Sequence, residues 1–169
     1  KARGKGISEM SDLGVIALFG VLLLAIFLWL QRRPRKAPEP PKRQIAVDGT
    51  NVMFWKNEKA QISTLKKVIK HLRHKGFDPV VFLDASSRHH VGDKSLDERK
   101  FAQVLGLSSN RIMVVPARTE ADTFILEFAG QQKLAVVSND RFRDRPNEAR
   151  NIKLVKGRFD GDRLVLKNL

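Results

Sequence analysis

Ile45-Ala46-Val47-Asp48-Gly49-Thr50-Asn51 is the stretch of sequence that decides the fold of this 169-residue chain. Its three leading apolar residues predict a short buried strand, and Asp48 followed by Gly49 predicts that the strand ends in a turn. An acid at the end of a buried strand has two interpretations. It either caps the turn locally, or it belongs to a functional site at the edge of a sheet.

Short apolar runs alternate with helical stretches after this strand. We expect further strands at residues 80–83, 112–115 and 134–137, and helices at 61–75, 95–105 and 120–131. In the last helix, Phe124, Ile125 and Phe128 are expected to face the core. Residues 152–155 and 164–166 flank a turn and predict a closing strand or hairpin. This alternation predicts an α/β fold with a mostly parallel sheet and helices on both faces.

Four acids, Asp48, Asp122, Asp140 and Asp144, lie at or near predicted strand ends and helix starts. Because ligands bind at the carboxyl ends of parallel strands, we expect Asp48, Asp122 and Asp140 to converge there from three separate segments. Taken singly, each acid is equally well explained as a turn residue or a helix cap. Together, in a chain with a net charge of +14, they indicate a divalent-metal site that acts on a polyanion such as RNA.

The strong positive charge points to a phosphate-bearing partner, either nucleic acid or an anionic membrane surface, although it would also serve simple solubility. The chain contains no cysteine, which excludes disulfides and thiolate zinc sites.

The N-terminal part contains 18 consecutive residues, 13–30, without a charge. As a helix they would span roughly 27 Å, close to the hydrocarbon thickness of a bilayer. Trp29 lies at the end of the run, and Gln31-Arg32-Arg33-Pro34-Arg35-Lys36 follows as a stop-transfer flank. A signal peptide would have a shorter apolar region and a small-residue cleavage site, and a core helix would not be apolar on every face. We therefore expect a membrane helix over residues 13–31.

More Lys and Arg residues flank the C-terminal side of this segment than the N-terminal side, which predicts a single-pass membrane protein with its C-terminal domain facing the cytoplasm. Small residues in the helix would allow two copies to pack as a homodimer. The expected organisation is a short N-terminal tail (1–12), the membrane helix (13–31), a basic proline-rich linker (32–43) and a folded domain (44–169).

Four segments of the folded domain, in order, carry a resemblance to a known family: Val47-Asp48-Gly49-Thr50-Asn51, Phe82-Leu83-Asp84-Ala85-Ser86-Ser87-Arg88, Glu120-Ala121-Asp122-Thr123-Phe124-Ile125 and Val137-Ser138-Asn139-Asp140-Arg141-Phe142-Arg143-Asp144. They resemble the NYN domain, and more narrowly the Regnase-like endoribonucleases of the PIN-like nuclease superfamily. The resemblance runs through residues 44–167. It implies a PIN-like or flavodoxin-like sheet and an RNase that depends on Mg²⁺ or Mn²⁺.

By position in the family, Asp48, Asp122 and Asp140 would bind the metal and Asp144 would be an accessory catalytic acid. Asn51 and Asn139 would orient ligands or phosphate. The Regnase-like enzymes carry two adjacent acids where this chain has Ala121-Asp122, so the number of metal ions is open. Glu120 would project from another angle of the helix.

Arg88, Arg141 and Arg143 are expected to hold RNA, because guanidinium groups bind phosphate in a bidentate manner. The alternative is that these arginines pair with neighbouring acids. Trp55, which we expect in a long loop after Asn51, would either stack on an unpaired base or fill the core.

The sequence thus predicts a membrane-anchored, metal-dependent endoribonuclease that acts on single-stranded RNA. The alternative is a catalytically inactive, membrane-tethered RNA-binding or scaffold module. A phosphohydrolase for small molecules lacks support, because there is no glycine-rich phosphate loop and no Asp-x-Asp pair after the first strand.

Overall fold

The computed structural model describes most of the C-terminal part of the chain, residues 42–116, 119 and 121–169. In the N-terminal part it describes residues 14, 16, 17, 20, 22–26, 28 and 29, all of them helical. The chain divides into two units, residues 1–40 and 41–169. Within the described residues no helix is long and apolar enough to cross a membrane. The predicted membrane helix at 13–31 falls largely outside the described residues, and residues 32–41 of the predicted linker lie wholly outside them.

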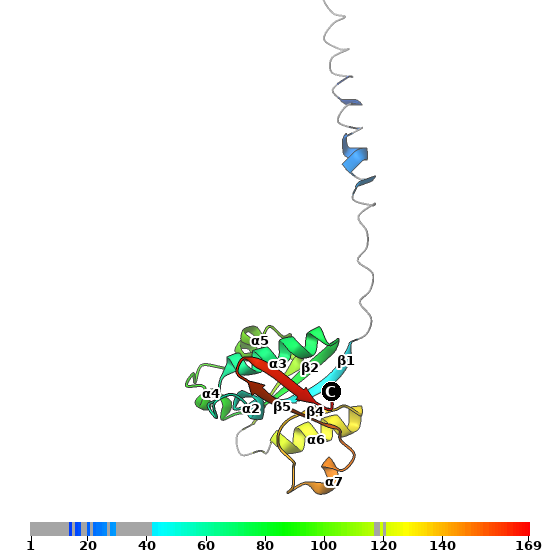
Figure 1. Ribbon diagram of the computed structural model, residues 1–169. Coiled ribbons are helices and arrows are strands. Elements are labelled where there is room, and N and C mark those ends of the chain that lie inside the picture. The colour runs from blue at the N-terminus through cyan, green and yellow to red at the C-terminus, as the bar shows by residue number, and fades with distance from the viewer. Residues whose placement is uncertain are drawn as a thin grey trace, which may run out of the picture. The chain divides into compact units, whose positions relative to one another are not determined.

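The C-terminal unit is built on a six-stranded sheet with the strand order β3-β2-β1-β4-β5-β6 (Figure 1). The strands are β1 (Arg43–Asp48), β2 (Phe77–Asp84), β3 (Ile112–Val115), β4 (Val136–Val137), β5 (Leu154–Asp160) and β6 (Arg163–Lys167). Strands β1 to β5 run parallel, and β6 pairs with β5 in the antiparallel direction. The predicted mostly parallel α/β fold and its closing hairpin are confirmed.

The helices are α2 (Gly49–Met53), α3 (Ile62–His74), α4 (Ser87–His90), α5 (Glu98–Leu105), α6 (Ala121–Gln132) and α7 (Pro146–Ala149), with a 3₁₀ turn, η1 (Ser109–Arg111). Helices α3 and α5 lie on one side of the sheet, and α6 and α7 on the other (Figure 1). Each side has its own buried apolar cluster.

Successive side chains of the central strands point to opposite faces, so each strand contributes to both clusters. In β1, Ile45 and Val47 face the α3 side while Ala46 faces the α6 side. In β2, Val81 packs on the α3 side and Phe82 on the other. A strand buried on both faces must be apolar throughout, which explains the continuous apolar runs in the sequence.

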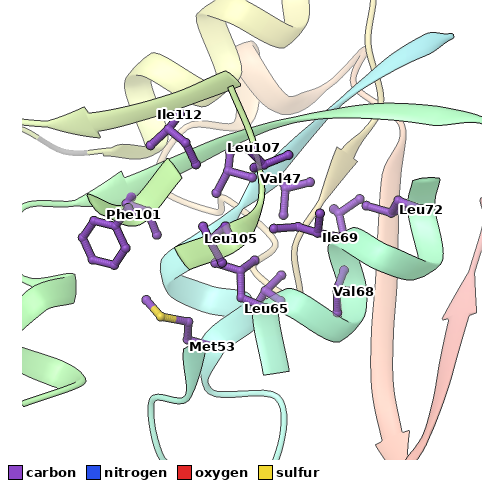
Figure 2. Close-up of a cluster of buried hydrophobic side chains, with 14 of the residues drawn as sticks. Val47, Met53, Leu65, Val68, Ile69, Leu72, Phe101, Leu105, Leu107 and Ile112 are labelled. Carbon is purple, nitrogen blue, oxygen red and sulfur yellow. The ribbon is translucent and has the colours of Figure 1, made fainter. Parts of the chain in front are cut away.

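Helix α3 covers the larger cluster with a stripe of apolar residues spaced three and four apart: Leu65, Val68, Ile69 and Leu72, packed with Phe101 and Leu105 of α5 (Figure 2). Gly76, which has a φ of 81°, follows the helix and allows the chain to turn into β2. Helix α5 begins three residues later than expected, because Asp97 is extended and its side chain accepts a hydrogen bond from the Lys100 N–H at 2.8 Å.

Two further expectations need correction. Phe124 of α6 was expected in the core with Ile125 and Phe128, but its side chain is 36% exposed, whereas Ile125 is buried and Phe128 packs at the edge of the smaller cluster. A long loop was expected directly after Asn51, but helix α2 continues to Met53, because Asp48 caps a helical turn directly after β1. A single turn stabilised by one cap has no periodic pattern by which it could be recognised.

The strand order places β1 between β2 and β4, so the direction in which strands are added reverses between β1 and β4. In open parallel sheets, ligands bind at this reversal, beyond the carboxyl ends of the strands. Asp48 ends β1, and Ser138 directly follows β4. The fold therefore presents both segments at the position where a site is expected.

Candidate active site

The acids predicted from the sequence share one electrostatic environment at the carboxyl edge of the sheet. Burial is the largest cause that raises the pKa of Asp122, the negative charges of Asp140, Asp144 and Asp84 add to it and Arg145 opposes it, and the resulting pKa is about 6. The pKa of Asp48 is raised to about 7, mainly by burial and less by the charges of Asp122 and Asp84, against two hydrogen bonds that lower it. Burial is the larger cause of both rises, and the added effect of like charge shows that Asp122 lies within electrostatic range of Asp48, Asp140 and Asp144.

Asp48 is held rigidly at the end of β1. One carboxylate oxygen, Oδ1, accepts a hydrogen bond from the Asn51 backbone N–H at 3.0 Å, and Oδ2 accepts one from the Ser138 hydroxyl at 2.8 Å. The interpretation of Asp48 as the residue that caps the turn is therefore confirmed. Capping uses Oδ1, and the second oxygen is turned towards β4.

Ser138 connects two of the acids. Its side chain is fully buried, and Oγ both donates to Asp48 and accepts from the Asp140 N–H at 3.0 Å. Asp140 itself is exposed, and its Oδ1 accepts from the Phe142 N–H at 2.7 Å, which folds the segment into a tight turn. Sequence reasoning did not select Ser138, although a polar residue directly after a buried strand is a usable signal.

Asp84 is a second residue that sequence reasoning did not select for the site. It ends β2, beside β1, and its charge contributes to the raised pKa of both Asp48 and Asp122. Its backbone N–H donates to the Thr50 hydroxyl at 2.9 Å, and that hydroxyl lies 2.9 Å from the Ser87 hydroxyl. The signal was present in the sequence, because Asp84 follows a buried strand in the same way as Asp48.

Asn51 and Asn139, expected to orient ligands, are committed to hydrogen bonds within the protein. The Asn51 Oδ1 accepts from the Trp55 ring N–H at 2.8 Å and from the Asn139 backbone N–H at 3.0 Å. The Asn139 amide donates to the Gly157 carbonyl at 2.8 Å and accepts from the Gly157 N–H at 3.0 Å. These side chains position the segment after β4 against α2 and β5.

Trp55 packs against the larger core cluster and lies tightly over Gly157. The Trp55 side chain is half-buried, and its packing favours the second of the two alternatives, a contribution to the core. Its neighbour Phe54 is exposed and meets the His90 ring edge-on, with ring centroids 5.5 Å apart.

The predicted cationic residues surround the acids. Arg88, in α4, lines a groove of about 300 Å³ together with Asp84. Arg141 and Arg143 are exposed beside Asp140 and Asp144. Within the part of the chain that the structure describes, none of these three arginines forms an ion pair, so their charges are not used by the neighbouring acids.

Lys156, on β5, is a cation that sequence reasoning missed. Its ammonium group donates a hydrogen bond to the main-chain carbonyl of Asp140. Partial burial lowers its pKa, while the charges of Asp140 and Asp48 oppose that effect. Only the pairing of β5 with β4 brings Lys156 beside the acids, so its position cannot be read from the sequence.

The oxygen-rich donor set has the chemistry that a hard divalent ion prefers. Among the residues described, however, no three His, Asp or Glu side chains lie close enough together to form a complete ligand set. Glu120 lies outside the described residues, and Ala121 begins α6. Burial raises the pKa values of Asp48 and Asp122, and the charges of neighbouring carboxylates add to both rises. A hydrated cation would relieve this excess of negative charge, so the residues present fit a metal held partly through water.

Two solved structures, both described as the nuclear protein-only RNase P 2 of Arabidopsis thaliana, are similar to this chain with TM-scores of 0.59 and 0.57. They are 16% and 17% identical to it and cover 96% and 98% of it. The chain spans 37% of the length of either, and at this identity the likeness shows a common fold. A comparison with curated proteins gave no match.

The sequence also matches a family description, that of the Zc3h12a-like ribonuclease NYN domain, over residues 41–165. The match includes every acid of the cluster and all six strands of the sheet except the last residues of β6. The chain therefore belongs to the Zc3h12a-like ribonuclease NYN domain family.

Proposed function

We propose that this protein is a metal-dependent endoribonuclease that hydrolyses phosphodiester bonds of single-stranded RNA. The observation that carries the proposal is a set of acids at the carboxyl edge of a ribonuclease-family sheet. There the charges of Asp84, Asp140 and Asp144 add to the raised pKa of Asp122, and the charges of Asp122 and Asp84 add to that of Asp48. Such a concentration of like charge opposes folding and is typical of a functional site.

Asp48, Asp122 and Asp140 are the proposed metal-binding residues, with Mg²⁺ or Mn²⁺ as the ion. A bound divalent ion supplies stabilisation of negative charge on the phosphate and lowers the pKa of water. Asp144 and Asp84 keep the local potential negative, so that a cation is attracted from solution.

The remaining residues orient these acids and the substrate. Ser138 keeps an Asp48 oxygen pointed towards β4 and simultaneously holds the backbone of Asp140. Arg88, Arg141 and Arg143 would bind phosphates beside the acids; in support, their guanidinium groups form no ion pair among the described residues.

The test is cleavage of labelled single-stranded RNA by the full chain with Mg²⁺, with Mn²⁺ and with a chelator. We expect cleavage with metal only, and a loss of at least about a hundredfold in Asp48→Asn, Asp122→Asn and Asp140→Asn. Glu127→Gln is the matched control, because Glu127 is an exposed acid on the same helix as Asp122. Cleavage that persists in chelator would contradict the metal requirement.

The alternative function, an inactive RNA-binding module, is favoured by Ala121, which stands where related enzymes carry an acid, and by the incomplete ligand set. The same experiment separates the two. RNA binding without cleavage under any metal would establish the binding module.

We further propose that residues 13–31 anchor the protein in a membrane, with the folded domain on the cytoplasmic side. In support, the described residues of this segment are helical and carry exposed apolar side chains, such as Ile16 and Leu23, which are 69% and 65% exposed. Extraction of membranes with alkaline carbonate should leave the full chain in the pellet and release a variant that lacks residues 1–31. The homodimer that the small residues would allow stays a prediction.

A further inference from the structure

One face of the β5–β6 hairpin carries three cations, Lys156, Arg158 and Lys167, which we call the hairpin cationic face. With Gly157 and Val165 they line a groove of about 170 Å³. Lys156 and Arg158 are two residues apart on β5, and Lys167 lies directly opposite Lys156 on β6, so all three side chains project from the same face.

This arrangement is unfavourable for folding. Like charges directly opposite one another weaken an antiparallel pair. Within the described residues none of the three cations forms an ion pair, while Asp162, at the hairpin turn, is bound by Lys56 and Lys67 instead. Asp140 and Asp48 attract Lys156 at longer range, but among the described residues no carboxylate forms an ion pair with Lys156 or Lys167 that would offset their repulsion.

The hairpin cationic face adjoins the acid cluster. Val155 pairs with Val137 in the parallel register, so the next residues, Lys156 and Ser138, stand at the same level of the sheet. The Lys156 ammonium binds the Asp140 carbonyl, and Arg158 lies one step further along β5 towards the turn of the hairpin. The cations therefore begin beside the acids and continue away from them.

We propose that the hairpin cationic face binds the phosphate backbone of single-stranded RNA adjacent to the cleaved bond. This inference rests on the proposed ribonuclease function and specifies where its substrate lies. The acids repel phosphate, so a strand that enters the site requires compensating cations beside it. A row of lysine and arginine side chains that starts at Asp140 meets that requirement, and the phosphates would in turn relieve the repulsion between Lys156 and Lys167.

Lys167→Glu, made in the full chain, is the decisive substitution. It places an acid opposite Lys156, so the hairpin gains a cross-strand ion pair and the melting temperature should rise. RNA binding should weaken by tenfold or more, because one phosphate contact is lost and a repulsive charge is added. A residue with only a structural role would not move the two quantities in opposite directions.

The measurement is fluorescence anisotropy of a labelled single-stranded RNA in chelator, so that no cleavage occurs. We also expect Arg158→Gln with Lys167→Gln to reduce the slope of log K against log salt by about 1.4, since each phosphate contact on a single strand contributes about 0.7. Lys133→Gln with Lys153→Gln is the matched control. It removes the same charge from a groove beside Arg43, at the opposite edge of the sheet.

Equal weakening by both double variants would overturn the proposal, because the effect would then reflect overall charge. Unchanged RNA affinity in Lys167→Glu would overturn it as well, as would a loss of affinity for anionic phospholipid vesicles without a loss for RNA. The nuclease proposal is decided by a different measurement, RNA cleavage. If the wild-type chain binds RNA but never cuts it, the hairpin proposal is still decided by Lys167→Glu.

Discussion

Ser138 is the residue on which the geometry of the candidate site depends most directly. It is fully buried and joins the Asp48 carboxylate to the Asp140 backbone through one hydroxyl group. In Ser138→Ala both hydrogen bonds are lost, so we expect the free energy of unfolding to fall by about 1–3 kcal/mol. The pKa of Asp48 should rise further, because a bond that lowers it is removed.

The measurement for Ser138→Ala is the pH profile of RNA cleavage together with chemical denaturation. The acid limb of the profile should move to higher pH. Ser108→Ala is a suitable control, because the Ser108 hydroxyl is exposed and bonds only to Asn110 nearby. An unchanged profile would show that Ser138 supports folding alone.

Asp48 should make the metal-free domain less stable as the pH rises. Its pKa is about 7 in the folded state against an ordinary value of 3.8 in the unfolded chain, so between these values the folded state binds more protons than the unfolded state. The free energy of unfolding must then fall as pH increases from about 4 to 7. Asp48→Asn should flatten this dependence, with part remaining from Asp122, whose pKa is about 6.

Urea denaturation in chelator at several pH values across this window checks the prediction for Asp48. The total effect is limited to a few kcal/mol, since one pKa unit corresponds to about 1.4 kcal/mol. Glu127→Gln should leave the wild-type dependence intact. If the free energy of unfolding of Asp48→Asn and of the wild type changes equally with pH, the pKa of Asp48 is not raised in the folded state.

At the scale of elements, β5 packs closely against the segment that follows α2, where Gly157 meets the Trp55 ring. A side chain at Gly157 would place its Cβ 2.0 Å from the Trp55 ring, closer than any real contact. We therefore expect Gly157→Ala to lower the free energy of unfolding by about 1–3 kcal/mol, and to disturb the Asn139 bonds to the Gly157 backbone.

Gly130→Ala provides the comparison for Gly157→Ala. Gly130 lies within α6, and a Cβ there would meet nothing within 4 Å. Alanine favours the helix, so this variant should be neutral or gain up to about 1 kcal/mol. The measurement is the melting temperature of both variants. A Gly157→Ala protein as stable as the wild type would show that β5 packs less tightly against Trp55 than the contact implies.

At the scale of the whole molecule, a chain with a net charge of +14 keeps a cluster of acids, which includes Asp48 and Asp122, at one edge of a sheet. A divalent ion that binds this edge should stabilise the folded state, and more so at about pH 8 than at about pH 5, because Asp48 and Asp122 must lose their protons to bind it. The check is the melting temperature with and without Mg²⁺ or Mn²⁺ at both pH values. An equal shift at both, or an undiminished shift in Asp140→Asn, would contradict metal binding at these acids.

Much of the fold was accessible from local patterns. The strand at residues 112–115 and the helix ended by Gly76 follow from apolar spacing and turn residues, which act over a few neighbouring positions. The acids were accessible for the same reason, since each stands beside a recognisable strand or helix start. Phe124 was misjudged because the pattern shows which residues are apolar, while its exposure depends on what covers that side of α6.

By itself, therefore, the sequence determined the α/β class, the positions of most strands and the acids at their ends, because periodicity and turn chemistry are properties of adjacent residues. Only the tertiary structure decided that Ser138 bridges Asp48 and Asp140, that Asp84 joins the cluster, and that Lys156 and Lys167 face each other beside it. These relations depend on strand order and register, which are settled when distant segments pack together and bury their apolar faces.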